Sequence, residues 1–270
     1  MGTLSRTYRL GFGTWMLTGT TCTEAVAKAI ETGYRFIDTA QYYENEKEVG
    51  AAIAASGMRD DLFVATKVWV DRLGYKDVLK STNVSLKKLG LKSVDLLYVH
   101  WPSPPNYKPE ETLRAFCELV DLELVRNIGV SNFTPALIDE AIAVCEGYGK
   151  AIMAVQVEHH PLLQQREMRE YLNGKDMDLV AYSPLARRRA LDVPELVQVA
   201  EKHGVSTGQV SLAWIIAHGA IPIPKSAKPE HIEDNFKAQD LALDADDIAL
   251  IDSIGNERRI IDPEGIAPEW

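Results

Sequence analysis

Four polar residues that could carry out acid–base chemistry lie at or just after the ends of short apolar runs. Asp38 ends RFID, Lys67 ends FVATK, His100 ends LLYVH, and Tyr43 lies five residues after Asp38. A buried lysine needs a nearby anion, which Asp38 can supply. The protonated lysine would lower the pKa of a neighbouring phenol, which is about 10 in water. Tyr43 could then protonate a carbonyl oxygen near neutral pH, with His100 orienting that oxygen.

The elements that position these residues follow from an alternation of short apolar runs with amphipathic stretches. The runs are rich in β-branched and aromatic residues, as expected of parallel strands buried on both faces. They cover residues 8–15, 35–39, 62–68, 95–101, 125–131, 151–158, 178–183 and 220–224. The stretches with helical periodicity cover residues 21–33, 44–57, 76–90, 111–122, 134–147, 165–173, 194–203, 206–217, 229–238 and 244–254.

Eight strands, each followed by a helix, predict an α/β fold of the (β/α)8 TIM-barrel class. We expect residues 1–270 to form this barrel as a single domain. A doubly wound sheet would need a third glycine after Gly11 and Gly13, but Met16 occupies that position. Because the C-terminal ends of barrel strands meet at one mouth, Asp38 and Lys67 should lie close together there.

The composition indicates which kinds of partner the protein could bind and in which cellular compartment it could reside. The net charge of −10 disfavours nucleic acids and anionic membranes, which both attract basic surfaces. The three cysteines, Cys22, Cys117 and Cys145, contain no C-x-x-C pair, so we predict neither a disulfide framework nor a zinc site. His159 and His160 are adjacent and lack a third ligand, so we assign no metal. With no signal-peptide pattern, we expect a cytoplasmic monomer that does not contact membranes.

The same polar residues allow other chemistries. A single strand-end aspartate, lysine or histidine is more often structural than catalytic, whereas four at one mouth favour catalysis. Lys67 or Lys225 could instead be a Schiff-base nucleophile. Asp38 and Glu158 could form a glycosidase pair, but the strands that carry them are expected on opposite sides of the barrel.

Motifs spread along nearly the whole chain resemble those of the aldo-keto reductase family. They are GFGTW (11–15), GYRFIDTAQYYENEKEVG (33–50), VATKVW (64–69), DLLYVHWP (95–102), GVSNF (129–133), QVEHHP (156–161), AYSPLA (181–186) and IPKSAKPEHIEDNF (223–236). The short connections and tail are similar to those of the prokaryotic 2,5-diketogluconate reductase type. The resemblance implies that Asp38, Tyr43, Lys67 and His100 form the catalytic tetrad, with Tyr43 rather than Tyr42 as the acid.

The resemblance also implies a nicotinamide cofactor, from which a hydride passes to a carbonyl carbon without a metal. The implied nicotinamide contacts are Ser131, Asn132, Gln156 and Tyr182, and the AYSPL motif adds Ser183 and Leu185. The implied contacts at the adenosine end are Lys225, Ser226, His231, Asp234 and Asn235. Loops after strands 7 and 8 commonly bind phosphate in barrels, which agrees with this placement.

The adenosine-end segment departs from the family pattern at two positions. His231 stands where the family usually has arginine, and Asp234 is one methylene shorter than the usual glutamate. Neutral histidine holds a 2′-phosphate more weakly than arginine. We therefore predict that NADPH is favoured through Lys225 and that NADH is also used. The arginine run 187–189 is either a solvated loop or a contact to the cofactor pyrophosphate.

The implied substrate is a small-molecule aldehyde, ketone or keto sugar. Trp15, His100 and Trp101 flank the expected mouth and are candidate substrate contacts. Further aromatic residues that could surround a carbonyl compound are Tyr42, Trp69 and Trp270. Short loops predict an open, shallow site of modest selectivity. The alternative within the family is a nucleotide-binding regulatory partner, like the potassium-channel beta subunits, but four intact tetrad positions argue against a purely non-catalytic role.

Overall fold

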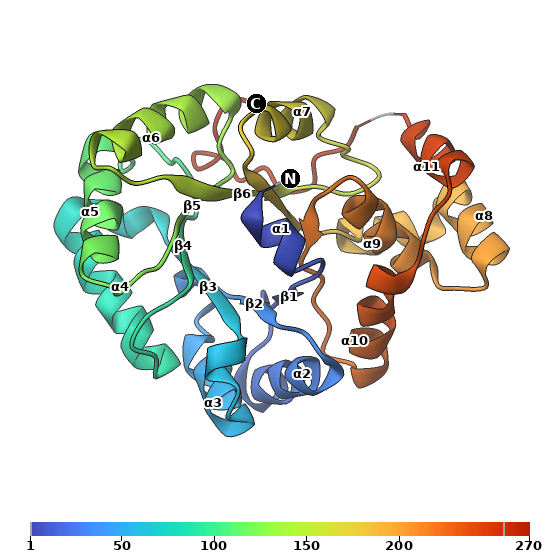
Figure 1. Ribbon diagram of the computed structural model, residues 1–270, viewed down its shortest axis with the longest axis horizontal. Helices are drawn as coiled ribbons and strands as arrows, with labels where there is room; N and C mark the ends of the chain where they lie inside the picture. Colours follow the sequence, from blue (N-terminus) through green and yellow to red (C-terminus); the bar gives the residue numbers. More distant parts are fainter. Residues whose placement is uncertain (1, 256) are drawn as a thin grey trace.

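The computed structural model describes residues 2–255 and 257–270 and shows an eight-stranded parallel sheet in the order β1 to β8 (Figure 1). The strands are Phe12–Gly13, Phe36–Asp38, Phe63–Val68, Leu96–Val99, Ile128–Ser131, Ile152–Glu158, Asp178–Tyr182 and Ile221–Pro222. The Gly11 and Gly13 amides donate to the Pro222 and Pro224 carbonyl oxygens, both at 3.0 Å, which closes the sheet. A Cβ on Gly13 would lie 2.7 Å from the Ile223 oxygen, so this closure requires glycine. The (β/α)8 prediction is confirmed.

Helices form a ring outside the strands, as Figure 1 shows. They are α2 (Gly19–Thr32), α3 (Glu46–Ser56), α4 (Tyr75–Leu89), α5 (Pro109–Asp121), α6 (Pro135–Gly147), α7 (Arg166–Gly174), α8 (Pro194–His203), α9 (Thr207–Ala217), α10 (Pro229–Phe236) and α11 (Ala245–Asp252). Each overlaps a predicted helical range to within about two residues at its start, because the apolar stripe of each helix packs on the barrel. No helix in the described part of the chain is long and apolar enough to cross a membrane.

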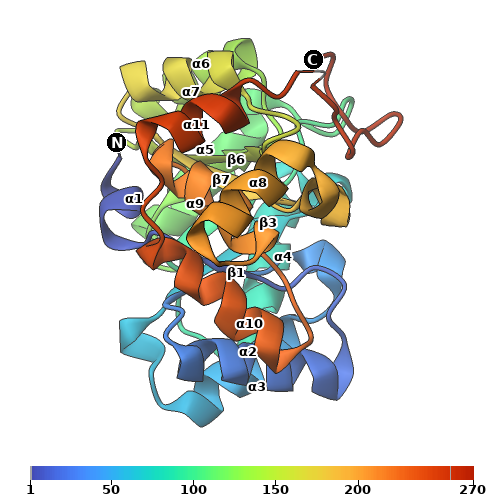
Figure 2. The ribbon, with the colours of Figure 1, turned by 90° about the vertical axis from the view of Figure 1, so that its right-hand side faces the viewer.

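The first predicted strand is wrong over most of its length. Residues Thr3–Thr7 form helix α1, Tyr8 follows it, and β1 holds only Phe12–Gly13. The Asp178 carboxylate, at the start of β7, accepts the amides of Leu4 and Ser5 at 2.8 and 2.9 Å. The apolar residues near the N-terminus therefore form a plug that closes the N-terminal end of the barrel. Figure 2 shows α1 at one end and the C-terminal tail at the other.

Two hydrophobic cores hold the barrel rigid. The larger core fills the space between the strands and the helices. The smaller core lies inside the barrel and includes Phe36, Leu96, Tyr98 and Val180, closed below by Leu4. Because side chains alternate along each strand, Lys67 points inward above this inner core while Thr66 points toward α3. The polar side chains at the mouth therefore stand on a packed apolar base.

Candidate active site

A buried ion pair joins the C-terminal ends of β2 and β3. The ammonium of Lys67 donates to Oδ1 of Asp38 and to the carbonyl oxygen of Thr39, the latter at 2.9 Å. The second Asp38 oxygen accepts from Nε2 of Gln156 at 2.8 Å. Asp38 and Lys67 are both fully buried, and burial, the largest effect, raises the pKa of Asp38 and lowers the pKa of Lys67. Their mutual attraction opposes both shifts and keeps the charges together.

Tyr43 completes a chain of three polar groups. Nζ of Lys67 donates to Oη of Tyr43 at 3.3 Å, and the Tyr43 ring meets the His100 ring edge-on at 5.8 Å between centroids. A single 3-10 turn over Gln41–Tyr43 directs neighbouring side chains apart. Tyr42 is 53% exposed and stacks on Trp69 with centroids 3.9 Å apart. The structure thus places Tyr43, and not Tyr42, beside the lysine.

The predicted lowering of the Tyr43 pKa is wrong. Burial, the larger effect, and the Asp38 carboxylate raise the pKa of Tyr43 well above 10. Lys67 was expected to lower it, but Asp38 neutralises that lysine. The consequence is a phenol that holds its proton at neutral pH and gives it up only to a strongly basic acceptor.

His100 supplies a neutral ring beside the phenol. Burial, and then the Lys67 charge, hold the pKa of His100 well below 6.5, so the imidazole is uncharged near pH 7. Its Nδ1 is buried with no hydrogen-bond partner among the described residues. The backbone carbonyl of His100 accepts from Nδ2 of Asn132 at 3.0 Å, which fixes the strand end. A buried unpaired nitrogen next to Tyr43 suits a site that receives a polar ligand.

The residues predicted to hold the nicotinamide lie together beside these groups. The Asn132 amide donates to Oγ of Ser131 at 3.0 Å and accepts from Oη of Tyr182 at 2.8 Å. Gln156 bonds to Asp38, so this group is continuous with the ion pair. Ser183 and Leu185 follow on the loop after β7, where Ser183 has a left-handed φ of 48°.

The residues predicted to hold the adenosine end form a second group, on the loop after β8 and on α10. Lys225 and His231 are exposed, and Ser226 and Asn235 are buried. Oγ of Ser226 accepts the Lys228 amide at 3.0 Å, which shapes the loop. The Asp234 carboxylate accepts from Ser206 and Gln209 at the start of α9. Asp234 therefore has a structural role, and its adenine contact stays a prediction.

Aromatic residues and the C-terminal tail border the mouth. Trp101 packs edge-on against Trp270 with centroids 6.3 Å apart, and the Arg187 guanidinium lies 4.7 Å from the Trp15 ring centroid. Glu158, at the end of β6, accepts the amides of Ile260 and Ile261 at 3.0 and 2.9 Å. From the sequence we did not predict that Glu158 holds the C-terminal tail through these bonds. Because these bonds and His160 occupy the buried Glu158 carboxylate, the geometry disfavours a glycosidase pair.

Asn45 is a positioning residue that the sequence reasoning also missed. Its amide donates to the carbonyl oxygens of Thr14 and Leu17 at 2.8 and 2.9 Å, and its Oδ1 accepts from Oγ1 of Thr39 at 2.7 Å. These bonds tie the turn that carries Tyr43 to the loop after β1. Asn45 lies within the predicted helix 44–57 and directly before the observed α3, a position that suggests a helix cap, but no side-chain cap bond forms.

We predict that Asn45→Ala destabilises the chain by about 2–4 kcal/mol, because it leaves the Leu17 carbonyl oxygen and the Thr39 hydroxyl without their buried partner and removes one of two bonds to the Thr14 carbonyl oxygen. Urea denaturation measures this change. Asn83→Ala, which removes a single exposed bond on α4, is the matched control and should change stability by less than about 0.5 kcal/mol. Equal effects of the two substitutions would contradict the role given to Asn45.

Comparisons with known proteins agree with this geometry. Residues 9–256 match the model of the aldo/keto reductase family. The chain is 40% identical over 262 residues to methylglyoxal reductase DkgB of Escherichia coli O157:H7, covering 96% of this chain and 97% of that protein. It is 41% identical over 243 residues to glyoxal reductase of Bacillus subtilis strain 168, covering 90% and 86%. A solved structure provisionally named 2,5-diketo-D-gluconic acid reductase B superposes with a TM-score of 0.92, at 35% identity and over 97% and 93% of the two chains. This chain therefore belongs to the aldo/keto reductase family of oxidoreductases.

Proposed function

We propose that this chain reduces small aldehydes, ketones or keto sugars to alcohols with NAD(P)H, using Asp38, Tyr43, Lys67 and His100. The observation that carries the proposal is the position of the Lys67 ammonium, which bonds to both Asp38 and Tyr43 at the barrel mouth. Tyr43, the proton donor, is thereby next to Lys67, whose charge stabilises the phenolate, and Lys67 is next to its counter-charge, Asp38. Acyl transfer or glycoside cleavage would need a nucleophile that this arrangement does not offer.

The residues beside Tyr43 fit a nicotinamide. Ser131, Asn132 and Gln156 are buried side chains with donor and acceptor atoms, as a carboxamide requires, and the Tyr182 ring lies next to them. When bound, the reduced nicotinamide supplies a hydride to the carbonyl carbon. Ser226 and exposed Lys225 would hold the phosphates at the other end of the cofactor.

The proton that balances the hydride comes from Tyr43. As negative charge develops on the carbonyl oxygen, the phenol donates its proton there and becomes a phenolate. Lys67, 3.3 Å from that oxygen, stabilises the phenolate, and Asp38 holds Lys67 in place. Neutral His100 can donate a hydrogen bond to the carbonyl oxygen and orient it. A fully buried Lys67 in three hydrogen bonds is poorly placed for a Schiff base, which weakens that alternative.

A cofactor panel tests the proposal. Oxidation of NADPH and of NADH is followed by absorbance with methylglyoxal, glyoxal, simple ketones and keto sugars, since two relatives are named as methylglyoxal and glyoxal reductases. We expect turnover of several substrates, with NADPH preferred by less than a thousandfold because exposed His231 replaces an arginine fork. His231→Arg should raise the NADPH preference about tenfold. Tight NADPH binding without turnover of any carbonyl would favour the regulatory nucleotide-binding alternative instead.

The shifted pKa values predict a flat pH profile. The pKa of Tyr43 is raised well above 10 and that of His100 is lowered well below 6.5, so neither group changes charge between about pH 7 and pH 9. We expect kcat/KM for the carbonyl substrate, at saturating NADPH, to vary less than about threefold over that range. Stopped assays in overlapping buffers measure it. A drop with a midpoint near pH 8 would contradict the assignment of Tyr43 as a fully protonated acid.

A further inference from the structure

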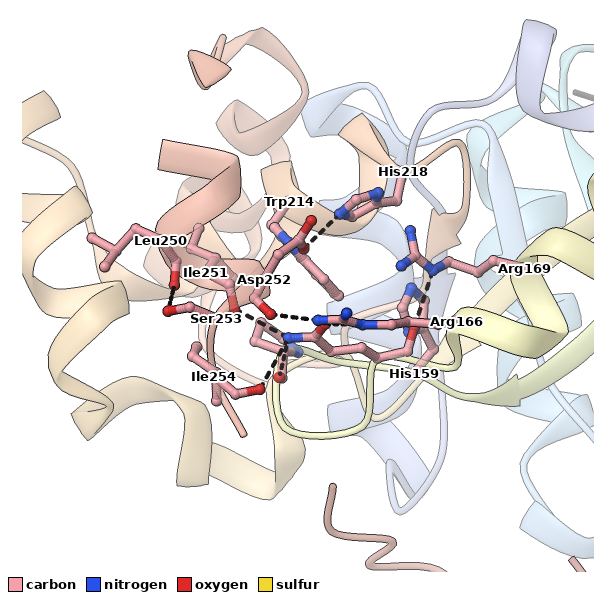
Figure 3. Close-up of polar contacts among 12 residues, drawn as sticks. His159, Arg166, Arg169, Trp214, His218, Leu250, Ile251, Asp252, Ser253 and Ile254 are labelled. Carbon is pink, nitrogen blue, oxygen red and sulfur yellow. Dashed lines mark hydrogen bonds and ion pairs between the residues drawn. The ribbon is translucent and has the colours of Figure 1, made fainter. Parts of the chain in front are cut away.

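A polar cavity of about 260 Å³ lies between one side of α7 and the end of α11. Its lining residues are Arg166, Arg169, Glu170, Asn173 and Asp252, and none belongs to the candidate active site. Figure 3 shows the two arginines directed toward the end of α11. The volume far exceeds the roughly 30 Å³ share of one water molecule, so the cavity admits a group of several heavy atoms.

One buried residue holds both guanidinium groups in place. Nε and Nη2 of Arg166 donate to Oε1 of Gln164 at 3.0 and 2.8 Å, and Nε of Arg169 donates to the Gln164 backbone oxygen at 3.0 Å. Gln164 is 2% exposed, and its own amide donates to the carbonyl oxygens of Ile251 and Pro161. The arginines therefore keep a defined orientation at little further entropic cost on binding.

Neither arginine forms a close ion pair within the described part of the chain, although the Asp252 and Glu170 carboxylates line the same cavity. Among the described residues no carboxylate oxygen forms an ion pair with Arg166 or Arg169. Oδ1 of Asp252 instead accepts from Nε1 of Trp214 and Nε2 of His218 at 2.9 and 3.0 Å, on α9. Burial, the largest effect, lowers the pKa of Arg169, the Asp252 charge opposes this shift, and the Arg166 charge adds to it. Two adjacent positive charges from the N-terminal half of α7 thus face the cavity, and the helix N-terminus beside Arg166 also favours anions.

We propose that this cavity binds a phosphate group, either inorganic phosphate or the phosphate of a small monoester. Guanidinium groups match the spacing of phosphate oxygens, and the nitrogens not bonded to Gln164, namely Nη1 of Arg166 and the two Nη atoms of Arg169, can donate to a phosphate. Asp252 and exposed Glu170 line the same cavity and weaken the attraction, but neither forms a close ion pair with the arginines. Because Gln164 also bonds to Ile251 in α11, a bound phosphate stabilises the segment from which the C-terminal tail departs.

Isothermal titration calorimetry with inorganic phosphate in low-salt buffer tests the proposal. Arg166→Gln and Arg169→Gln should each weaken binding at least tenfold, and Glu170→Gln should tighten it about threefold. Arg114→Gln, on the exposed face of α5, removes the same charge elsewhere and should change nothing. Glycerol 3-phosphate is titrated in parallel: an equal affinity identifies the phosphate alone as the ligand, and a tighter one identifies a monoester.

Phosphate could also bind at the proposed cofactor loop, so every titration is repeated in the Lys225→Gln background. Binding that persists there and disappears with the α7 arginines supports the proposal. Binding that disappears with Lys225→Gln alone, or that is unchanged by both arginine variants, overturns it. If the arginine variants fail to fold, Glu170→Gln decides, because Glu170 is exposed and its side chain forms no hydrogen bond or close ion pair with the described residues. Unchanged or weaker phosphate binding then overturns the proposal.

Discussion

Tyr43→Phe is expected to slow carbonyl reduction by roughly 10²–10⁴-fold, the usual contribution of a positioned general acid. The substitution removes one hydroxyl, 3.3 Å from the Lys67 ammonium, and keeps the ring that packs against His100. No other group at the mouth can replace the proton, since His100 is neutral and Lys67 is held by Asp38. The loss should appear in kcat, and NADPH binding, followed by quenching of protein fluorescence, should stay within about threefold.

Tyr42→Phe is the matched control, because it removes the same atom from the adjacent residue. Tyr42 stacks on Trp69 at the edge of the mouth and its hydroxyl has no part in the proton path. We expect a rate within about twofold of the wild type. A Tyr43→Phe enzyme with comparable turnover, or a Tyr42→Phe enzyme with the larger loss, would overturn the assignment of the acid.

Lys67→Met is expected to abolish measurable reduction and to destabilise the fold by about 3–5 kcal/mol. The substitution leaves the Asp38 carboxylate fully buried without its cation, with only the Gln156 amide to compensate it. The phenolate of Tyr43 would also lose the charge that stabilises it. Steady-state rates and urea denaturation of the same preparations measure the two effects separately.

The double variant Asp38→Asn, Lys67→Met separates stability from catalysis. With both charges removed, the burial penalty disappears, and we expect most of the lost stability to return because neutral groups of similar volume replace the pair. Activity should not return, since the phenolate still lacks a cation. Recovery of activity together with stability would mean that Lys67 acts only as a structural residue.

The structure also shows how far the sequence could be interpreted. The ranges of strands β2 to β7 and of the main helices were predictable, because each shows its own hydrophobic period over enough residues. The N-terminal segment was not, because Leu4 and Tyr8 are apolar for a different reason, as parts of a plug held by Asp178. A short apolar run in the sequence looks the same whether it forms a strand or part of the plug at the end of the barrel.

In the candidate site, too, some features were predictable from the sequence and others were not. The order of Asp38, Tyr43, Lys67 and His100 after consecutive strands predicted that they meet, and the structure brings them together. The direction of the Tyr43 pKa shift was predicted wrongly, because burial and the Asp38 charge depend on distances in three dimensions. The bonds of Asn45 and Glu158 join segments far apart in the chain, and no local pattern marks such pairs.

The sequence by itself determined the barrel and the residues that reach its mouth, because hydrophobic period and strand order are local properties of the chain. Only the tertiary structure decided which of these groups are charged, which are already bonded to each other, and where the tail lies. Those properties depend on desolvation and on contacts between distant segments. The α7 arginines illustrate the difference: their spacing in the polar stretch REMRE (166–170) predicts only a helix surface, and the buried Gln164 turns them toward one cavity.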